Sequence, residues 1–193
     1  LRTGTLLIVW GYFKKVVVAD RLAAFVDPVY GRVHDQTGTA LLAATVLFAF
    51  QIYADFSGYT DLALGSARCF GVRLSPNFDA PYGALSIGEF WRRWHMSLSS
   101  WLRDYLFMPI TSWLSRRVAA EQVLRVRSDV FIYGCGTIAT MLLCGFWHGA
   151  HWTFVVWGGL HGTYLLLSVA TRSLRRSMLR VLRIRREGVP WSI

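Results

Sequence analysis

The sequence predicts an all-α protein that crosses a membrane several times. Hydrophobic residues make up 54% of the 193 residues and charged residues only 17%, whereas soluble domains carry about 25% charged residues. Val130 to Thr171 contains no Asp, Glu, Lys or Arg, and it is long enough for two crossings of about 20 residues each. Open sheets do not survive in lipid, so we expect transmembrane helices joined by short re-entrant or interfacial helices.

The N-terminal part predicts one clear span between shorter segments. Residues 3–13 are apolar, two lysines follow, and residues 16–26 are again apolar except for Asp20 and Arg21. This pattern favours the end of a span that continues as an interfacial or tilted helix. We expect a polar connection over residues 27–38, because Pro28 disfavours helix at the residue before it. Residues 37–54 lack charges and predict a span. Residues 62–71 are too short to cross and fit a re-entrant segment buried in protein.

The second half predicts an interfacial helix followed by a helical hairpin. Residues 74–82 fit a loop rich in Pro and Asn. Ser86 and Glu89 match a capping box that begins a helix. Residues 90–105 mix Trp with Arg, as a helix at the level of the lipid headgroups does. Basic residues flank the charge-free run on both sides, so both outer ends are expected in the cytoplasm and Trp147 to Gly149 at the far turn.

The distribution of charge favours membrane lipid over nucleic acid as the partner of the basic residues. The net charge is +10, but seven arginines fall between Arg172 and Arg186, directly after an apolar run. Positive charge at that place follows the positive-inside rule, and it suits anionic lipid. We therefore expect a membrane domain over residues 1–171 and a basic juxtamembrane tail over residues 172–193. The chain begins without Met or a signal-peptide pattern, which we interpret as a fragment of a longer protein.

Two histidines are candidates for proton chemistry. His148 lies among apolar and aromatic residues, where a neutral imidazole is favoured and can take a proton from an attacking hydroxyl. Ionisable groups at membrane depth are functional candidates, although a buried histidine bonded to a backbone carbonyl is the structural alternative. His95 follows Trp94 in the Arg/Trp stretch, and an interfacial histidine that faces water is its alternative.

Other polar residues predict structural roles. His148 and His151 have metal-ligand spacing, with His161 further on, but no carboxylate or cysteine completes a ligand set, so we predict no metal site. Asp55 and Asp61 near the end of a span need partners. Structural ion pairs with Arg68, Arg73 or Arg92 are favoured over catalysis, and Asp104 beside Arg103 has the same interpretation. Glycine-rich phosphate loops and G-x-S-x-G are absent from the sequence.

Three sequence blocks resemble the membrane-bound O-acyltransferase family, in its bacterial alginate O-acetyltransferase-like branch. The first is Gln51 to Gly65, which contains Asp55-Phe56-Ser57-Gly58-Tyr59. The second contains Phe90-Trp91-Arg92-Arg93-Trp94-His95 and Arg103-Asp104-Tyr105, and the third contains Gly145-Phe146-Trp147-His148-Gly149-Ala150. The resemblance covers residues 6–167. Residues 109–117 depart from the Pro-Leu-Gly-Gly-Asn turn of alginate-type members, which leaves the acceptor open.

The resemblance implies a fold, a reaction and a set of site residues. The fold is a multi-pass helical domain around a central tunnel, in the bacterial inner membrane. The reaction moves an acyl group from a cytoplasmic thioester, acetyl-CoA or another, to a hydroxyl of a cell-envelope polysaccharide or to a periplasmic acetyltransferase partner. No bound cofactor is implied. His148 would be catalytic, with His95 as the second polar residue of the tunnel. The tunnel or substrate-binding residues would be Trp94, Trp147, Asp55, Asp61, Arg92, Arg93 and Asp104.

Two other functional classes remain open at the level of sequence. A proton-coupled transporter or channel would use the histidines as a relay, with helix breaks near Gly158, Gly159 and Gly162. A non-catalytic scaffold for a periplasmic transferase would not need His148 for acyl transfer. Acyl esters on an acceptor separate an enzyme from a transporter, and a His148 variant separates an enzyme from a scaffold.

Overall fold

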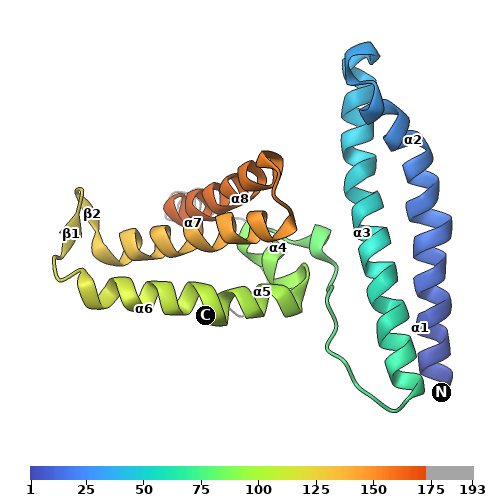
Figure 1. The fold of residues 1–193 in the computed structure, drawn as a ribbon, viewed down its shortest axis with the longest axis horizontal. Coiled ribbons are helices and arrows are strands. Elements are labelled where there is room, and N and C mark those ends of the chain that lie inside the picture. Colours follow the sequence, from blue (N-terminus) through green and yellow to red (C-terminus); the bar gives the residue numbers. More distant parts are fainter. Residues whose placement is uncertain (173–193) are drawn as a thin grey trace, which may run out of the picture. The chain divides into compact units, whose positions relative to one another are not determined.

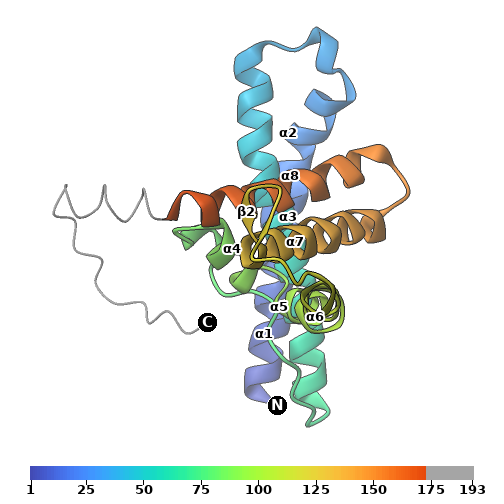
Figure 2. The ribbon, with the colours of Figure 1, turned by 90° about the vertical axis from the view of Figure 1, so that its left-hand side faces the viewer.

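The computed structural model describes residues 1–172, and it confirms an all-α fold. These residues belong to two compact units, one formed by Leu1–Asp79 and the other beginning at Ala80. Figures 1 and 2 show that each unit is built from helices, apart from one small β-hairpin in the second unit. Three helices, Gly38–Cys69, Ser128–His148 and Trp152–Ala170, are long and apolar enough to cross a membrane. The predicted tail over residues 172–193 lies outside the described residues, except for Arg172.

The first unit is a long antiparallel pair of helical rods (Figure 1). One rod runs without a break through α1 (Arg2–Tyr12), a π-helical segment (Phe13–Ala19) and α2 (Asp20–Gly31). A short 3₁₀ turn (Val33–Asp35) leads to the other rod, α3 (Gly38–Cys69). At 1.5 Å per residue, the 32 residues of α3 extend about 48 Å, which exceeds the hydrocarbon core of a bilayer.

Two expectations for this unit were wrong. Pro28 lies inside α2, whose last residue is Gly31, so the polar connection begins later than predicted. Val26 and Val29 on either side of Pro28 are buried, and this packing maintains the helix despite the proline. Residues 62–69 continue α3 and do not form a separate re-entrant segment. The length of the apolar stretch suggested that the helix ends before Asp55. The helix continues because Asp55 and Asp61 pair with lysines of the same unit.

Glycines on both rods allow their backbones to approach closely. A β-carbon at Gly11 would lie 2.7 Å from the carbonyl oxygen of Gly58, and one at Gly65 would lie 2.6 Å from that of Gly4. Neither distance leaves room for a side chain, so the two rods meet along a seam of small residues, as membrane helices often do. Gly58 and Gly65, which belong to the first sequence block, therefore have a packing role.

The described part of the second unit contains five α-helices beyond an extended loop, as the loop prediction for residues 74–82 anticipated. The loop ends in a 3₁₀ turn (Pro81–Gly83), and α4 (Ile87–Arg93) and α5 (Met96–Leu102) follow. A π-helical segment (Arg103–Phe107) continues into α6 (Met108–Arg117). The β-hairpin of β1 (Gln122–Val123) and β2 (Val126–Arg127) then leads into α7 (Ser128–His148) and α8 (Trp152–Ala170).

The predicted helical hairpin is confirmed. Helices α7 and α8 are antiparallel neighbours in both views (Figures 1 and 2), and residues 149–151 turn the chain between them. Glycines again permit the contact, since β-carbons at Gly145 and Gly158 would overlap the carbonyl oxygens of Phe154 and Met141, respectively. Helix α8 is continuous through Gly158 and Gly162, so the helix breaks that a transporter predicts are not found at these glycines.

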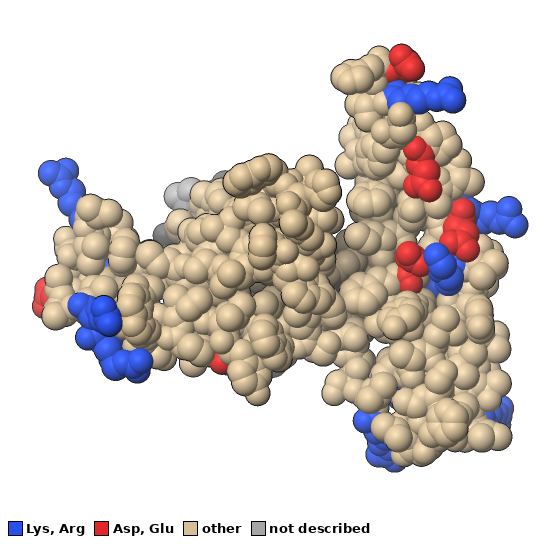
Figure 3. Space-filling view, in the orientation of Figure 1, with Lys and Arg blue, Asp and Glu red and all other residues tan. Residues whose placement is uncertain are grey.

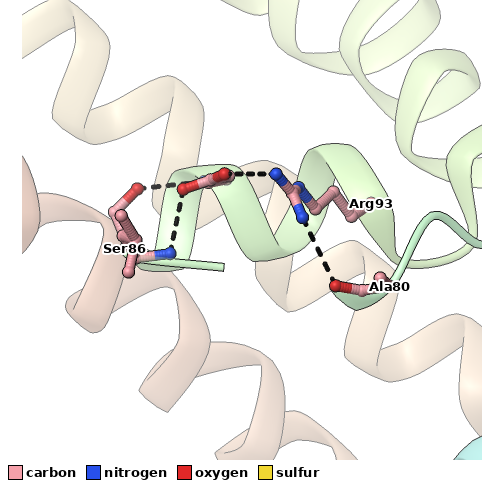
Figure 4. A network of polar contacts seen from close by, with 5 residues as sticks. Ala80, Ser86 and Arg93 are labelled. Carbon is pink, nitrogen blue, oxygen red and sulfur yellow. Dashed lines mark hydrogen bonds and ion pairs between the residues drawn. The ribbon is translucent and has the colours of Figure 1, made fainter. Parts of the chain in front are cut away.

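The predicted capping box begins α4, but the helix is shorter than expected. The backbone N–H of Glu89 donates to the Ser86 hydroxyl (3.2 Å), and the Glu89 carboxylate accepts from the backbone N–H of Leu85 (2.9 Å). Glu89 also pairs with Arg93 at 2.7 Å, and Arg93 donates to the carbonyl of Ala80 at 3.5 Å (Figure 4). The expected single helix over residues 90–105 is interrupted at His95, which has a left-handed backbone conformation.

Candidate active site

His148 is the last residue of α7, and aromatic rings surround its side chain. Its ring lies 5.0 Å from that of Trp147 and 5.2 Å from that of Trp157, both edge to face, and it stacks on Phe154 at 6.0 Å. The next residue is Gly149, where a β-carbon would lie 2.9 Å from the Phe154 ring. Because Gly149 has no β-carbon, Phe154 has room to stack on one side of the imidazole. The side chain of His148 remains exposed in the described part of the chain, so a reactant can approach it.

His95 occupies the break between α4 and α5. Its backbone has φ 42° and ψ 55°, a left-handed conformation that costs a residue with a β-carbon roughly 1–2 kcal/mol. Strained residues of this kind persist where the surrounding structure requires them, and they cluster at functional sites. The break separates α4 from α5, and it gives the backbone of His95 a conformation that a continuous helix would not allow.

The two histidines are in electrostatic range of each other. Burial lowers the pKa of His95 below its ordinary value of 6.5, and positive charge on His148 lowers it further. His95 is therefore a neutral base at pH 7. Two neutral imidazoles within one unit can each accept a proton from a hydroxyl.

An aromatic layer beside the histidines is a feature that sequence reasoning missed. The Trp157 ring touches the rings of His148 (5.2 Å), His161 (4.6 Å) and Trp91 (5.9 Å). Trp91 also contacts His161 at 5.2 Å, so α4 is joined to α8 through these rings. The signal was present as a helical spacing on one face of α8: Phe154, Trp157, His161 and Tyr164.

The other predicted residues of the Arg/Trp block lie in the same unit but differ in their contacts. Trp94 caps the C-terminus of α4 and stacks on Phe90 at 5.5 Å. Arg93 is engaged by Glu89 and the carbonyl of Ala80, which is a structural role in holding the loop against α4. Arg92 is exposed on α4. Asp104 pairs with Arg103 at 2.7 Å, and this pairing lowers the Asp104 pKa, as predicted for a structural ion pair.

Asp55 and Asp61 belong to the first unit, where they pair with lysines and not with the predicted arginines. Lys14 meets Asp61 at 2.9 Å, and Lys15 meets Asp55 at 2.8 Å and Asp20 at 3.0 Å. These hydrogen bonds raise the pKa of Lys15 to about 12. Both lysines lie in the π-helical segment, which turns them towards α3. Figure 3 shows acidic and basic groups side by side partway along this unit.

The potential metal ligands are dispersed. No group of three or more His, Cys, Asp or Glu side chains with ligand geometry occurs among residues 1–172. His151 lies in the turn after α7 and is exposed, whereas His161 lies on α8 within the aromatic layer. The H-x-x-H spacing therefore does not bring these side chains together on one helix.

Comparison with known proteins agrees with the three sequence blocks. The model of the membrane-bound O-acyltransferase family matches residues 2–191. The chain belongs to the membrane-bound O-acyltransferase family. Within this family the described geometry places the Trp-Arg-Arg-Trp-His block and the Trp-His-Gly block in one compact unit. The Asp-Phe-Ser-Gly-Tyr block is in the other unit, where it supplies helix packing and ion pairs.

Curated relatives of this membrane-bound O-acyltransferase chain are named for three different acceptors. It is 44% identical over 162 residues to a probable alginate O-acetylase of Azotobacter vinelandii, covering 84% of this chain and 30% of that protein. It is 39% identical over 183 residues to a peptidoglycan O-acetyltransferase of Helicobacter pylori, covering 93% of this chain and 32% of that protein. It is 32% identical over 167 residues to a teichoic acid D-alanyltransferase of Streptococcus thermophilus, covering 84% of this chain and 39% of that protein. The chain therefore spans about a third of the length of these relatives.

Proposed function

We propose that the protein containing this chain is a membrane O-acyltransferase that moves an acetyl group from a thioester donor to a hydroxyl of a cell-envelope polysaccharide. Membership of the family supports acyl transfer to oxygen. The names of relatives, which include an alginate O-acetylase and a peptidoglycan O-acetyltransferase, support a polysaccharide acceptor. The observation that carries the proposal is the placement of His95 and His148 in one compact unit, with His148 exposed at the end of α7 beside the rings of Trp147 and Trp157.

The proposed reaction needs one base and one route for a proton. The acceptor hydroxyl oxygen attacks the acyl carbonyl carbon while the neutral imidazole of His148 takes the hydroxyl proton. The carbon–sulfur bond of the thioester then breaks, and the leaving thiolate receives a proton from the imidazolium. His95 stabilises this cycle by orienting a reactant or by sharing the proton. Positioned acid–base catalysis of this kind contributes about 10²–10⁴-fold in rate.

The histidine assignment is tested by variants of the full-length protein. His148→Ala should abolish acetylation of envelope glycans, measured by mass spectrometry of ester-bound acetyl groups, with an unchanged amount of protein in the membrane. His151→Ala is the matched control, because His151 lies three residues away in the exposed turn and should retain acetylation. Retention of most activity in His148→Ala would refute the catalytic role and favour a scaffold for a separate transferase.

The donor, the partner and the membrane are further parts of the proposal. We infer a cytoplasmic acyl thioester, such as acetyl-CoA, as the donor, and the bacterial inner membrane as the location of a multi-pass protein. The acceptor is either the polysaccharide or a periplasmic transferase that passes the acetyl group on. Purified full-length protein in lipid nanodiscs, supplied with radiolabelled acetyl-CoA and candidate glycans, should release free thiol in step with ester formation. Transport of a solute without ester formation would instead support a proton-coupled transporter.

A further inference from the structure

The β-hairpin between α6 and α7 has a turn that its sequence does not favour. Gln122 pairs with Arg127 and Val123 with Val126, which leaves a two-residue turn of Leu124 and Arg125. Both have positive φ, 52° and 65°. Turns of this type favour Asn-Gly or Asp-Gly, because only small or Asx residues adopt two left-handed conformations easily. The hairpin therefore presents Leu and Arg at its tip at a conformational cost.

The apolar residue at the tip, Leu124, is exposed to solvent. Leu124 is 85% exposed, and Trp113, in the second half of α6, is 49% exposed. The guanidinium of Arg117 lies 4.4 Å over the Trp113 ring. The Leu124 side chain therefore gains little burial within the described residues in return for its strained turn. Its exposure is favourable in the interface of a bilayer, where Leu reaches the acyl boundary and Trp and Arg lie at the headgroups.

Positive charge gathers at the same end of the unit, as Figure 3 shows. Arg116, Arg117 and Arg125 have no carboxylate within 4.0 Å among residues 1–172, whereas Arg127 is paired with Asp129 at 2.8 Å. Glu121 is the other acidic residue of this segment. The hairpin end is thus net positive and has guanidinium groups available for phosphate oxygens.

The hairpin also lies at the boundary of a span. Its second strand ends at Arg127, and α7, which is long enough to cross a membrane, begins at the next residue. We propose that the hairpin tip, defined as Leu124 and Arg125, inserts into the bilayer interface and binds anionic phospholipid together with Arg116 and Arg117. The occupant is the membrane surface that surrounds α7, and its negative charge complements that of the hairpin.

A fluorescent label at the tip tests the insertion. A full-length Leu124→Cys protein whose other cysteines are replaced by serine is labelled with an environment-sensitive dye. It is then reconstituted in nanodiscs of phosphatidylcholine with or without phosphatidylglycerol. The label should be quenched by spin-labelled lipid near the headgroups, more strongly with phosphatidylglycerol, and protected from aqueous iodide. Full access to iodide with no quenching by lipid in either nanodisc would overturn the proposal.

Two arginines of the same hairpin provide the matched comparison. Arg125→Gln should weaken the phosphatidylglycerol dependence of the quenching about fivefold, the effect of one basic residue at a charged membrane surface. Arg127→Gln should change it much less, because Arg127 is already paired. Equal effects of the two variants contradict a specific role for the tip. So does an Arg125 variant that loses binding of an acidic protein partner while its lipid dependence is unchanged.

A variant of the apolar residue separates insertion from simple folding of the turn. Asn accepts positive φ more readily than Leu, so Leu124→Asn should fold at least as well in neutral detergent. It should nevertheless lose the thermal stabilisation that phosphatidylglycerol gives the native protein. Loss of folding in detergent, or a lipid response equal to that of the native protein, would show that Leu124 serves the turn and not the membrane.

Discussion

The side chain of His95 lies within electrostatic range of His148, although 53 residues separate them in the chain. This relationship depends on the break between α4 and α5, because a continuous helix over residues 90–105 would give residue 95 ordinary helical geometry. It also depends on α7 ending at His148, where the chain turns back into α8. The candidate site thus draws on two helix ends of the second unit, the break after α4 and the C-terminal end of α7.

His95, which the proposed cycle uses in its neutral form beside the base His148, imposes one pH limit on acyl transfer. Burial and the charge of His148 lower this pKa below 6.5, so the base form of His95 is present at pH 7 and is lost only when the pH falls through the lowered value. We expect the acid limb of kcat/KM, which reports the free enzyme, to have its midpoint below pH 6.5. A midpoint above pH 6.5 would contradict a requirement of the reaction for neutral, partly buried His95.

The left-handed conformation of His95 makes two polar substitutions unequal. Asn adopts this conformation more readily than Gln, so His95→Asn should be more stable than His95→Gln by about 0.5–1 kcal/mol. Thermal unfolding of the two purified full-length variants measures the difference. Both variants should lose most acyl transfer, which distinguishes a functional histidine from a residue that serves the turn alone. Equal stability of the two would argue against left-handed strain at this position.

The contact between α7 and α8 predicts opposite effects of alanine at neighbouring glycines. A β-carbon at Gly158 would overlap the Met141 carbonyl, whereas one at Gly159 would meet only Leu142 at an ordinary 3.6 Å. Gly158→Ala should separate the helices and cost more than about 2 kcal/mol, as overpacking does. Gly159→Ala should be neutral or stabilising by up to about 1 kcal/mol, because Ala favours helix. Denaturation of the two variants and the native protein in mild detergent measures these differences in unfolding free energy.

The lysine–aspartate pairs of the first unit predict a larger effect at Asp61 than at Asp55. The side chains of Lys14 and Asp61 are only 15% and 18% exposed, so Asp61→Asn leaves a largely buried ammonium without its carboxylate, at a cost of about 3 kcal/mol. Asp55→Asn removes one of two partners of the more exposed Lys15, which retains Asp20. The midpoint temperature of thermal unfolding should therefore fall further for Asp61→Asn than for Asp55→Asn. Equal losses would contradict the difference in burial.

Much of the architecture could be predicted from local patterns. The charge-free run gave the α7–α8 hairpin with His148 at its turn, because length and hydropathy directly limit what can cross a bilayer. Ser86 and Glu89 marked the beginning of α4, since capping acts within one turn of helix. The continuity of α3 was predicted wrongly, because Lys14 and Lys15 neutralise the charges of Asp61 and Asp55 within it. The position of Pro28 was predicted wrongly, because the burial of Val26 and Val29 keeps the helix intact around the proline.

The sequence by itself determined the membrane class, the family resemblance, the α7–α8 hairpin and the two histidines as candidates. All of these depend on composition, spacing or motifs that act over a few residues. Only the tertiary structure decided that His95 interrupts a helix, that Trp157 lies against both His148 and His161, and that lysines and not arginines pair with Asp55 and Asp61. These relationships arise from packing between segments distant in the chain, where close contact of backbones and desolvation of charges select one arrangement among many.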